Sequence, residues 1–383
     1  MRLRQLDVLR AVAVLLVMFR HLEEGRDNPG LVGLVAHMNT APIDVGHAAE
    51  LLGRLLYRVG WVGVDLFFVL SGFLVSGLLF REHQKHRKIR PGRFLIRRGL
   101  KIYPLFYLFL LSTVLAIVFF TDRTFARGSI LCEALFVQNY GPNVWGHTWS
   151  LAIEEHFYLL LVALLLGLSK WGQMARIPAI FLVVALGCLG ARVLTTALIP
   201  AFDFKTHVFA THLRLDALFY GVVLSYAWHF ERARLAFCER GLSRPFVLLG
   251  GLLLFTPALF LKQDHPVMRT VGLSCLSLGG VLVILWSMTG PPVESRALGR
   301  VANALAWMGA YSYSIYLWHV PVLVVAAPIT ANVLNRVLGR PLGTLGELTV
   351  YVVGSVVAGV VTARLVEFPV LVLRDRWFPG EVK

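Results

Sequence analysis

The 383-residue sequence has few charged residues and few cysteines. Only 15% of its residues are Asp, Glu, Lys or Arg, whereas 57% are hydrophobic and the mean hydropathy is +0.69. Soluble domains usually contain about a quarter charged residues, so the composition excludes an ordinary soluble protein and predicts a polytopic membrane protein. The four cysteines are widely spaced without a CxxC pair, which argues against a disulfide framework and a thiolate metal site. We expect no bound metal ion.

The sequence also lacks an internal repeat, a low-complexity segment and a signal-peptide cleavage site. The apolar run near the N-terminus is broken by Arg10 and ends in charged residues around His21, so we interpret it as a first membrane span that is retained. The predicted organisation is one transmembrane domain, residues 1–373, followed by a short cytoplasmic tail, residues 374–383.

Ten apolar segments are long enough to cross about 30 Å of hydrocarbon, which takes roughly 20 helical residues. They lie near residues 6–22, 60–80, 103–120, 150–169, 177–199, 213–229, 246–261, 269–289, 305–329 and 347–367. Alternating connections place 24 Lys and Arg residues on one side and 12 on the other. Because Lys and Arg concentrate in cytoplasmic loops, we expect both termini in the cytoplasm. The predicted fold is therefore all-α, a bundle of about ten helices in the inner (plasma) membrane, in contact with its lipids.

The net charge of +15 is also explained by the concentration of Lys and Arg in cytoplasmic loops, so we expect no nucleic-acid partner.

Two polar residues interrupt the first span. Arg10 and His21 are eleven residues apart, so their side chains project from one helix face, about 16 Å apart along the axis. Arg10 would lie near the cytoplasm and His21 toward the other side, a placement typical of a protein that passes something between two compartments.

Asp65 stands in the apolar second span, where a carboxylate must be paired or face water. It is a candidate partner of a basic group and a candidate catalytic residue, and a helix-entry cap is the alternative.

Nine basic residues lie between positions 81 and 101, more than a topology anchor needs. Arg93, Arg97, Arg98 and Lys101 suit the phosphates of a nucleotide-type ligand, and anionic lipid headgroups are the alternative.

Polar side chains also open the fourth span and lie within the ninth. Ser150 and Glu154 are one turn apart and share a face. Trp149 is placed to border a sugar, and Glu154 to orient a histidine or take a hydroxyl proton; a pair of glutamates near a helix start also suits the helix dipole. Tyr316 and His319 are candidates for lining a substrate cavity or for anchoring the membrane interface.

Five stretches resemble acyltransferase family 3 of the membrane-bound O-acyltransferases: LDVLRAVAVLLVMFRH, GVDLFFVLSGFL, FLIRRGLKIYP, HTWSLAIEEHFY and YSYSIYLWHVP. They occur in this order over nearly the whole chain. The resemblance implies transfer of an acyl group, most often acetyl, from cytoplasmic acyl-CoA to a hydroxyl of a carbohydrate or glycosylated acceptor outside. It also implies that His21 is the essential catalytic histidine and Arg10 its partner. Arg98 and Lys101 would then be the basic pair and Glu154 the acidic member.

Acyl transfer from a thioester to a hydroxyl needs a base and stabilisation of an oxyanion. His21 is the best base, since a buried imidazole favours its neutral form. We expect acyl-CoA to place its phosphates on Arg97, Arg98 and Lys101 and its thioester near His21, while the acceptor enters near Glu154. Acyl-CoA is then a substrate, with no permanently bound cofactor. Direct transfer and a transient acyl-histidine both stay open.

A transporter or proton-coupled carrier is the alternative from another class, because isolated charged residues in spans also mark ion relays. The paired broken helices and inverted repeat of many carriers are not apparent in the sequence. A second alternative keeps the enzyme class but acts on a lipid-linked or secondary-metabolite sugar. The sequence leaves a homo-oligomer open.

Overall fold

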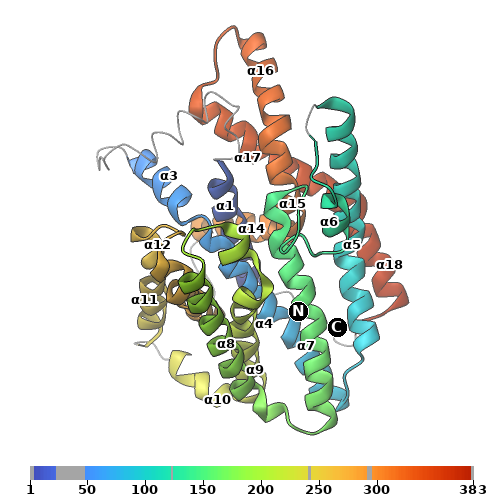
Figure 1. The fold of residues 1–383 in the computed structure, drawn as a ribbon, viewed down its shortest axis with the longest axis vertical. Coiled ribbons are helices and arrows are strands. Elements are labelled where there is room, and N and C mark those ends of the chain that lie inside the picture. The colour runs from blue at the N-terminus through green and yellow to red at the C-terminus, as the bar shows by residue number, and fades with distance from the viewer. Residues whose placement is uncertain (1–3, 23–47, 122–123, 240–242, 291–295, 381–383) are drawn as a thin grey trace.

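The computed structural model describes residues 4–22, 48–121, 124–239, 243–290 and 296–380, and these residues form helices without a strand (Figure 1). The α-helices are α1 (Arg4–Arg20), α3 (Ala48–Val59), α4 (Val62–His86), α5 (Pro91–Phe120), α6 (Ser129–Ala134), α7 (Trp149–Lys170), α8 (Ile177–Leu198), α9 (Thr211–Phe230), α10 (Arg232–Leu235), α11 (Ser243–Phe255), α12 (Pro257–Phe260), α13 (Leu273–Met288), α14 (Arg296–Ala310), α15 (Ser312–Pro321), α16 (Ala327–Leu338), α17 (Gly343–Thr362) and α18 (Phe368–Trp377). The predicted all-α fold is confirmed.

Eight stretches of helix among the described residues are long and apolar enough to cross a membrane, the architecture of a multi-pass membrane protein. Two of the ten predicted spans have no counterpart among these eight. The first coincides with α1, which has only 17 residues. The other coincides with α9, whose first turns carry Arg214 and Asp216. The count of ten and the side on which each terminus lies stay predictions.

Other predicted boundaries also differ from the structure. The predicted span 305–329 is divided, because α14 ends at Ala310 and α15 begins at Ser312. The stretch between the first two predicted spans contains helix α3, and residues 23–47 of this stretch lie outside the described part of the chain. Helix α18 continues to Trp377, past the predicted end of the membrane domain at 373.

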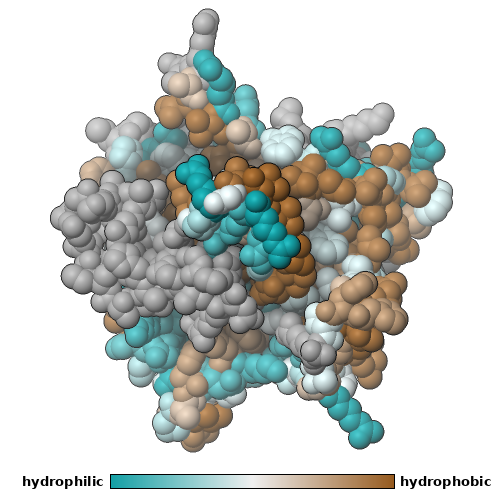
Figure 2. Space-filling view, turned by 90° about the horizontal axis from the view of Figure 1, so that it is seen from above, coloured by the Kyte–Doolittle hydropathy of each residue, from teal (hydrophilic) through white to brown (hydrophobic). Residues whose placement is uncertain are grey.

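Helix α4 forms the centre of the bundle. Its most apolar window is 78% buried, against 17% for the span that contains α8. Helices α4 and α9 pack closely because glycines meet at their contact: a Cβ on Gly72 would lie 1.9 Å from the Leu218 carbonyl oxygen, and one on Gly221 would lie 2.1 Å from that of Val69. Small residues allow helix backbones to approach in this way. Seen from above, brown apolar side chains cover much of the visible flank of the bundle (Figure 2).

The chain direction gives the bundle two distinct ends. Helix α4 ends at Arg87, whose backbone is left-handed (φ 53°) and whose N–H bonds to the His83 carbonyl oxygen. Helix α5 then starts with Pro91 in its first turn, where the missing N–H costs nothing. This tight turn places the cationic segment at the end of the bundle where α1 and α5 begin, which we call the basic end. His21 follows α1 and lies at the opposite end, the histidine end.

Candidate active site

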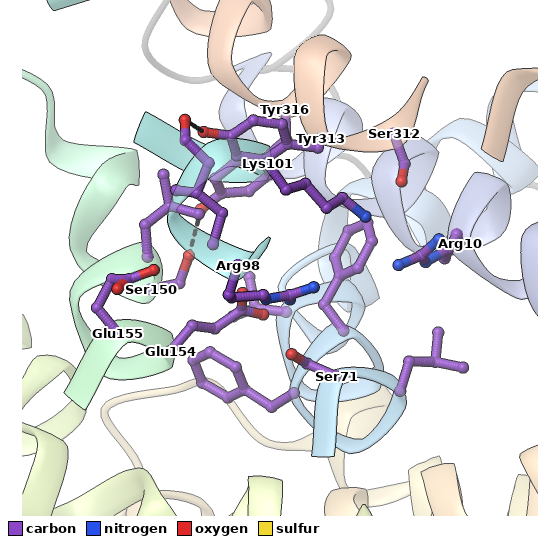
Figure 3. Close-up of a pocket in the computed structure, with 16 residues that line it drawn as sticks. Arg10, Ser71, Arg98, Lys101, Ser150, Glu154, Glu155, Ser312, Tyr313 and Tyr316 are labelled. Atoms are coloured by element: carbon purple, nitrogen blue, oxygen red, sulfur yellow. Dashed lines mark hydrogen bonds between the residues drawn. The ribbon is translucent and has the colours of Figure 1, made fainter. Parts of the chain in front are cut away.

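A cavity of about 80 Å³ lies in the middle of the bundle, and we call it the middle cavity. Arg10, Arg98 and Lys101 reach it from α1 and α5 (Figure 3). Ser150 and Glu154 line it from α7, so the predicted shared face of these two residues is confirmed. The cavity therefore combines three basic side chains with two carboxyl side chains, Glu154 and Glu155, and several hydroxyl groups.

Tyr158 connects the cations and the carboxylate of the middle cavity. Its hydroxyl donates to Glu154 Oε2 at 2.7 Å. Because a phenol has one hydrogen, the hydroxyl accepts from its two other partners, the Arg98 guanidinium and the Ser71 hydroxyl, the latter at 2.9 Å. The Arg98 guanidinium also lies over the Tyr158 ring, 4.4 Å from its centroid, which adds a cation–π contact. The network fixes Arg98 and Glu154 relative to each other.

The middle cavity continues toward the basic end. A second cavity of about 190 Å³, the basic cavity, shares Arg98 and Lys101 with it. The remaining charged side chains of the basic cavity are Arg81, Glu82, Arg93, Arg97 and Arg374. All four basic residues predicted to bind phosphate therefore line one cavity, together with two arginines, Arg81 and Arg374, that the sequence analysis did not single out.

The segment after α18 already occupies part of this cationic surface. The Arg93 guanidinium donates to the Pro379 carbonyl oxygen and that of Arg97 to the Phe378 carbonyl oxygen. Arg97 also pairs with Asp375 at 2.9 Å. These oxygen atoms lie against guanidinium groups as the oxygens of a phosphate would.

A larger cavity of about 520 Å³ lies at the histidine end, and we call it the histidine cavity. His21 and Arg20 line it from the end of α1, and Asp65 and Arg214 from the first turns of α4 and α9. Its aromatic lining consists of Trp61, Trp149, Phe204 and Phe209, and the rings of Trp149 and Phe209 are stacked with centroids 4.5 Å apart. Flat apolar rings beside hydrogen-bonding groups suit a sugar.

Hydrogen bonds determine the tautomer of His21. His21 Nδ1 lies 2.8 Å from the Val17 carbonyl oxygen, which only accepts, so Nδ1 carries the hydrogen. The same nitrogen lies 3.2 Å from His319 Nε2. His319 Nδ1 lies 2.6 Å from the Tyr316 carbonyl oxygen, so neutral His319 has its lone pair on Nε2. The single hydrogen on His21 Nδ1 is shared between the Val17 carbonyl oxygen and this lone pair. The lone pair of neutral His21 is therefore on Nε2.

A third histidine completes the cluster. The ring centroids of His147 and His319 are 5.0 Å apart, and those of His21 and His319 are 4.9 Å apart. His147 Nε2 lies 3.2 Å from the Leu317 carbonyl oxygen and donates to it. Within the described ranges, no group of three His, Cys, Asp or Glu has a metal-binding arrangement.

The wall between the middle and histidine cavities is thin. Val64 lines both. Beside it, the hydroxyls of Ser150 and Tyr316 lie 2.7 Å apart, and Tyr316 also donates to the His147 carbonyl oxygen. The two predicted substrate residues Ser150 and Tyr316 thus face the middle cavity and hold the segment that carries His147.

The structure places several predicted residues differently from the expectation. Glu154 lies in the middle cavity beside Tyr158 and does not line the histidine cavity, because five residues of helix separate it from Trp149 by about 7.5 Å along the axis. Arg10 lies at a different cavity from His21. His319 is fully buried behind His21. Asp65 has the basic partner that the sequence predicts, Arg214 at 2.5 Å.

Sequence reasoning missed Arg214, His147 and Glu133. Arg214 and its neighbour Asp216 are charges within a predicted span, and that signal was available. Glu133 is fully buried. Its Oε2 accepts from the Val144 and Trp145 backbone N–H groups at 2.6 and 3.2 Å, and its Oε1 lies 2.8 Å from the Thr148 hydroxyl. Glu133 therefore fixes the segment that leads to His147.

Burial raises the pKa of the Glu133 carboxyl above its usual value, and the hydrogen bonds from Thr148, Val144 and Trp145 partly oppose this rise. Glu133 lies in α6, outside the predicted spans.

Comparisons with known proteins identify relatives of this chain. The chain is 29% identical over 292 residues to peptidoglycan O-acetyltransferase OatA of Listeria monocytogenes, covering 70% of this chain and 46% of that protein. It is 27% identical over 343 residues to the putative peptidoglycan O-acetyltransferase YrhL of Bacillus subtilis, covering 82% and 51%. It is 26% identical over 337 residues to O-acetyltransferase OatA of Staphylococcus aureus, covering 80% and 53%.

The chain thus spans about half the length of these curated relatives. No solved structure matches it. A family model described as an acyltransferase domain matches residues 3–364, nearly the whole chain, and the resemblance seen in the sequence is confirmed: the chain belongs to acyltransferase family 3.

Proposed function

We propose that the protein transfers an acetyl group from acetyl-CoA, bound from the basic end, to a carbohydrate hydroxyl in the histidine cavity. In this proposal the basic end faces the cytoplasm of a plasma membrane, as the distribution of Lys and Arg favours. The observation that carries it is the order of sites along the bundle: a cationic cavity, a middle cavity that shares Arg98 and Lys101 with it, and then His21 beyond a thin wall.

The cationic cavity supports an acyl-CoA donor. Guanidinium groups form paired hydrogen bonds with phosphate oxygens, and several line the basic cavity. Phosphates held there leave the pantetheine arm to pass Arg98 and Lys101 into the middle cavity. The thioester then lies on the side of the wall opposite His21, and we propose that the acetyl group reaches the acceptor where Val64 separates the two cavities.

The His21 tautomer supports either of two chemical routes. In direct transfer, Nε2 takes the hydroxyl proton as the oxygen attacks the thioester carbonyl carbon. The C–O bond forms, the C–S bond breaks, and the thiolate leaving group takes the proton from the imidazolium. In the two-step route, Nε2 itself attacks the carbonyl carbon, the N–C bond forms, the C–S bond breaks and the thiolate leaves. The acceptor oxygen then attacks the acetyl carbon, the N–C bond breaks, and the released Nε2 takes the hydroxyl proton and passes it to the thiolate. Both need a lone pair on Nε2, where neutral His21 has it.

The names of the relatives favour a cell-wall acceptor. Two of them are named as peptidoglycan O-acetyltransferases, one of these as putative. We propose peptidoglycan or a related glycan as the acceptor class here. The aromatic lining of the histidine cavity suits the faces of sugar rings, and the cavity is several times larger than the middle cavity.

The test is release of free thiol by the purified protein in detergent, given acetyl-CoA and soluble peptidoglycan fragments. We expect thiol release that depends on the acceptor and O-acetylated glycan that is detected by mass spectrometry. His21→Ala should lower the rate by about 10²- to 10⁴-fold, the usual contribution of a general base. His265→Ala is the matched control, because His265 is a histidine of the α12–α13 connection that lines none of the cavities described above. Equal rates in both variants would refute the role of His21.

A further inference from the structure

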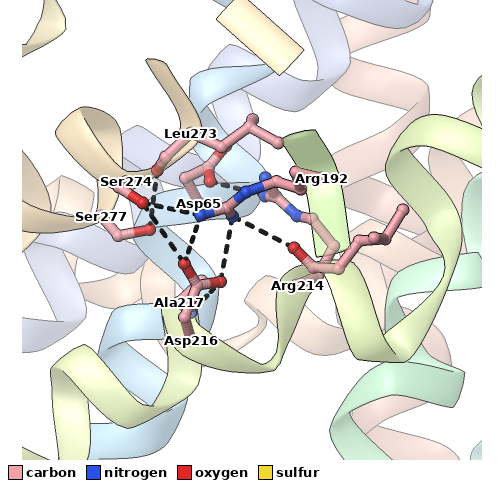
Figure 4. Close-up of polar contacts among 9 residues, drawn as sticks. Asp65, Arg192, Arg214, Asp216, Ala217, Leu273, Ser274 and Ser277 are labelled. Atoms are coloured by element: carbon pink, nitrogen blue, oxygen red, sulfur yellow. Dashed lines mark hydrogen bonds and ion pairs between the residues drawn. The ribbon is translucent and has the colours of Figure 1, made fainter. Parts of the chain in front are cut away.

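Two buried arginine–aspartate pairs lie side by side near the histidine end (Figure 4). Arg192 of α8 pairs with Asp216 of α9 at 2.8 Å, and Arg214 of α9 pairs with Asp65 of α4 at 2.5 Å. All four side chains are at most 2% exposed. The pairs have the same chemistry and the same burial, so a difference in their hydrogen bonding indicates a difference in role.

Both terminal nitrogens of the Arg192 guanidinium donate hydrogen bonds. Its Nη1 donates to the Leu213 carbonyl oxygen and to Asp216 Oδ1, and its Nη2 donates to Asp216 Oδ2 and to the Ser274 hydroxyl. Only its Nε has no partner among the described residues. Arg192 is also absent from the lining of the histidine cavity. These contacts are those of a structural ion pair that joins α8 to α9.

The Arg214 guanidinium uses only one of its three nitrogens in a hydrogen bond to a described residue. Its Nη2 donates to Asp65 Oδ1, whereas its Nε and Nη1 are buried and have no hydrogen-bond partner in the described part of the chain. A buried donor without a partner is costly, and such groups in native proteins call for an explanation. Arg214 also lines the histidine cavity together with His21. Both observations point to a ligand.

We propose that Arg214 binds an anionic oxygen of the acceptor, a carboxylate carried by the sugar that is acylated. This inference rests on the proposed function and adds the chemical class of the acceptor. The N–H groups of Nε and Nη1 point in different directions, so each can donate to an oxygen atom of the ligand, and hydrogen bonds from a guanidinium to a carboxylate are among the strongest. Asp65 accepts from Nη2 and orients the group.

The remaining charges of the cavity agree with an acidic ligand. Arg20 and Arg214 are its basic lining residues, and Asp65 is its acidic one. Because Asp65 is paired with Arg214 Nη2, a carboxylate in the cavity meets Arg20 and the Nε and Nη1 donors of Arg214. Trp149 stacks on Phe209 in the same lining, which provides an apolar surface for the sugar ring next to the charged group.

The experiment compares one sugar in two forms. The probes are the peptide-free disaccharide of peptidoglycan, whose lactyl group ends in a carboxylate, and the same disaccharide with that carboxylate converted to a carboxamide. Binding of each is measured by calorimetry on the detergent-purified protein without donor, and transfer is measured as thiol release with acetyl-CoA. We expect the wild type to bind the acid about 10- to 100-fold more tightly than the amide, the usual gain of a charge-assisted hydrogen bond.

Paired substitutions keep the protein free of an isolated buried charge. Asp65→Asn with Arg214→Gln removes the proposed site, and Asp216→Asn with Arg192→Gln removes the structural pair as a control. We expect the first double variant to lose the preference for the acid and the second to keep it, at similar unfolding temperatures. Arg214→Lys is a further variant that keeps the charge but loses the planar guanidinium. It should retain part of the preference for the acid over the amide.

The outcomes separate this inference from the proposed function. Loss of the acid preference in the Asp65 and Arg214 double variant alone supports the inference, since removal of Asp65 by itself would favour the acid. Equal binding of acid and amide by the wild type overturns it, as does equal loss of preference in both double variants. Either overturning result leaves thiol release and its dependence on His21 intact, whereas failure of the proposed function abolishes thiol release with every acceptor.

Discussion

His319 accepts a hydrogen bond from His21, and this bond becomes stronger when His21 gains a proton. We expect His319→Ala to lower kcat by about 10- to 100-fold, the range for a hydrogen bond to a charged group. The KM for acetyl-CoA should stay unchanged, because the basic cavity is at the other end of the bundle. His319→Gln should recover part of the rate, since its amide oxygen also accepts. Equal losses in the Ala and Gln variants would show that His319 only fills space.

Glu133 gives a pH-dependent prediction. A carboxyl whose pKa is raised by folding stabilises the fold when protonated, and this contribution is lost as the pH rises through the folded-state pKa. Glutamine mimics the protonated form and still accepts the Val144 and Trp145 N–H groups. We therefore expect Glu133→Gln to unfold at the same temperature as the wild type near the usual glutamate pKa of 4.5, and at a higher temperature at pH 8.

The measurement is thermal unfolding in detergent across this pH range. Glu133→Ala should unfold at a lower temperature than the wild type throughout, because the two backbone N–H groups lose their acceptor. A gap between Glu133→Gln and the wild type that stays constant with pH would contradict the raised pKa.

For single residues, the sequence points to polar side chains within the spans but does not identify the side chains that they contact. His21, Asp65 and Arg98 stand out because a polar side chain in an apolar span needs a reason. Their partners are distant in the chain: Asp65 bonds to Arg214 across 149 positions and His21 to His319 across 298. Spacing within one helix carries no information on such contacts, so the sequence alone does not name these partners.

Helices α5 and α18 meet beside the basic cavity, where Asp375 of α18 pairs with Arg97 of α5. If acetyl-CoA places a phosphate on Arg97, this pair competes with it. Asp375→Asn should then lower the KM for acetyl-CoA by up to about fivefold, since a partly exposed ion pair is worth about 0.2–1 kcal/mol. Arg97→Ala should raise it.

Initial rates over a range of acetyl-CoA concentrations test this prediction. The difference between Asp375→Asn and the wild type should shrink as the salt concentration rises, because salt screens exposed pairs. Asp264→Asn is the control, an aspartate in the α12–α13 connection rather than in the basic cavity. An unchanged KM in Asp375→Asn would place the phosphates elsewhere.

Elements were predicted where hydrophobic runs are long and unbroken, as in α4, α5 and α7. The boundary between α14 and α15 was missed, because the only signal is Gly309, and an isolated glycine in an apolar run does not by itself mark a helix end. Hydropathy along the sequence also does not predict how deeply each helix is buried in the bundle. Helices α4 and α8 are both apolar, with mean hydropathies of 2.1 and 2.3 over their best windows, yet one is central and the other peripheral. In a membrane, both lipid and core favour apolar residues.

For the whole molecule, the arrangement of cavities predicts that donor and acceptor enter from opposite ends and meet at the wall that contains Val64. Val64→Phe adds bulk to this wall. We expect Val64→Phe to retain acetyl-CoA binding, because the basic cavity is unchanged. It should lower kcat by at least about tenfold, because the added ring prevents the thioester carbonyl and the acceptor hydroxyl from aligning.

Val62→Phe is the matched control, since Val62 is a buried valine of the same helix that lines neither cavity. Overpacking costs about 1–3 kcal/mol at either position, so the two variants should unfold at similarly lowered temperatures and differ only in transfer. Equal transfer rates in Val64→Phe and Val62→Phe would mean that the acetyl group crosses the bundle by another route. A selective loss in Val64→Phe would place the reaction at the point where the two cavities approach each other.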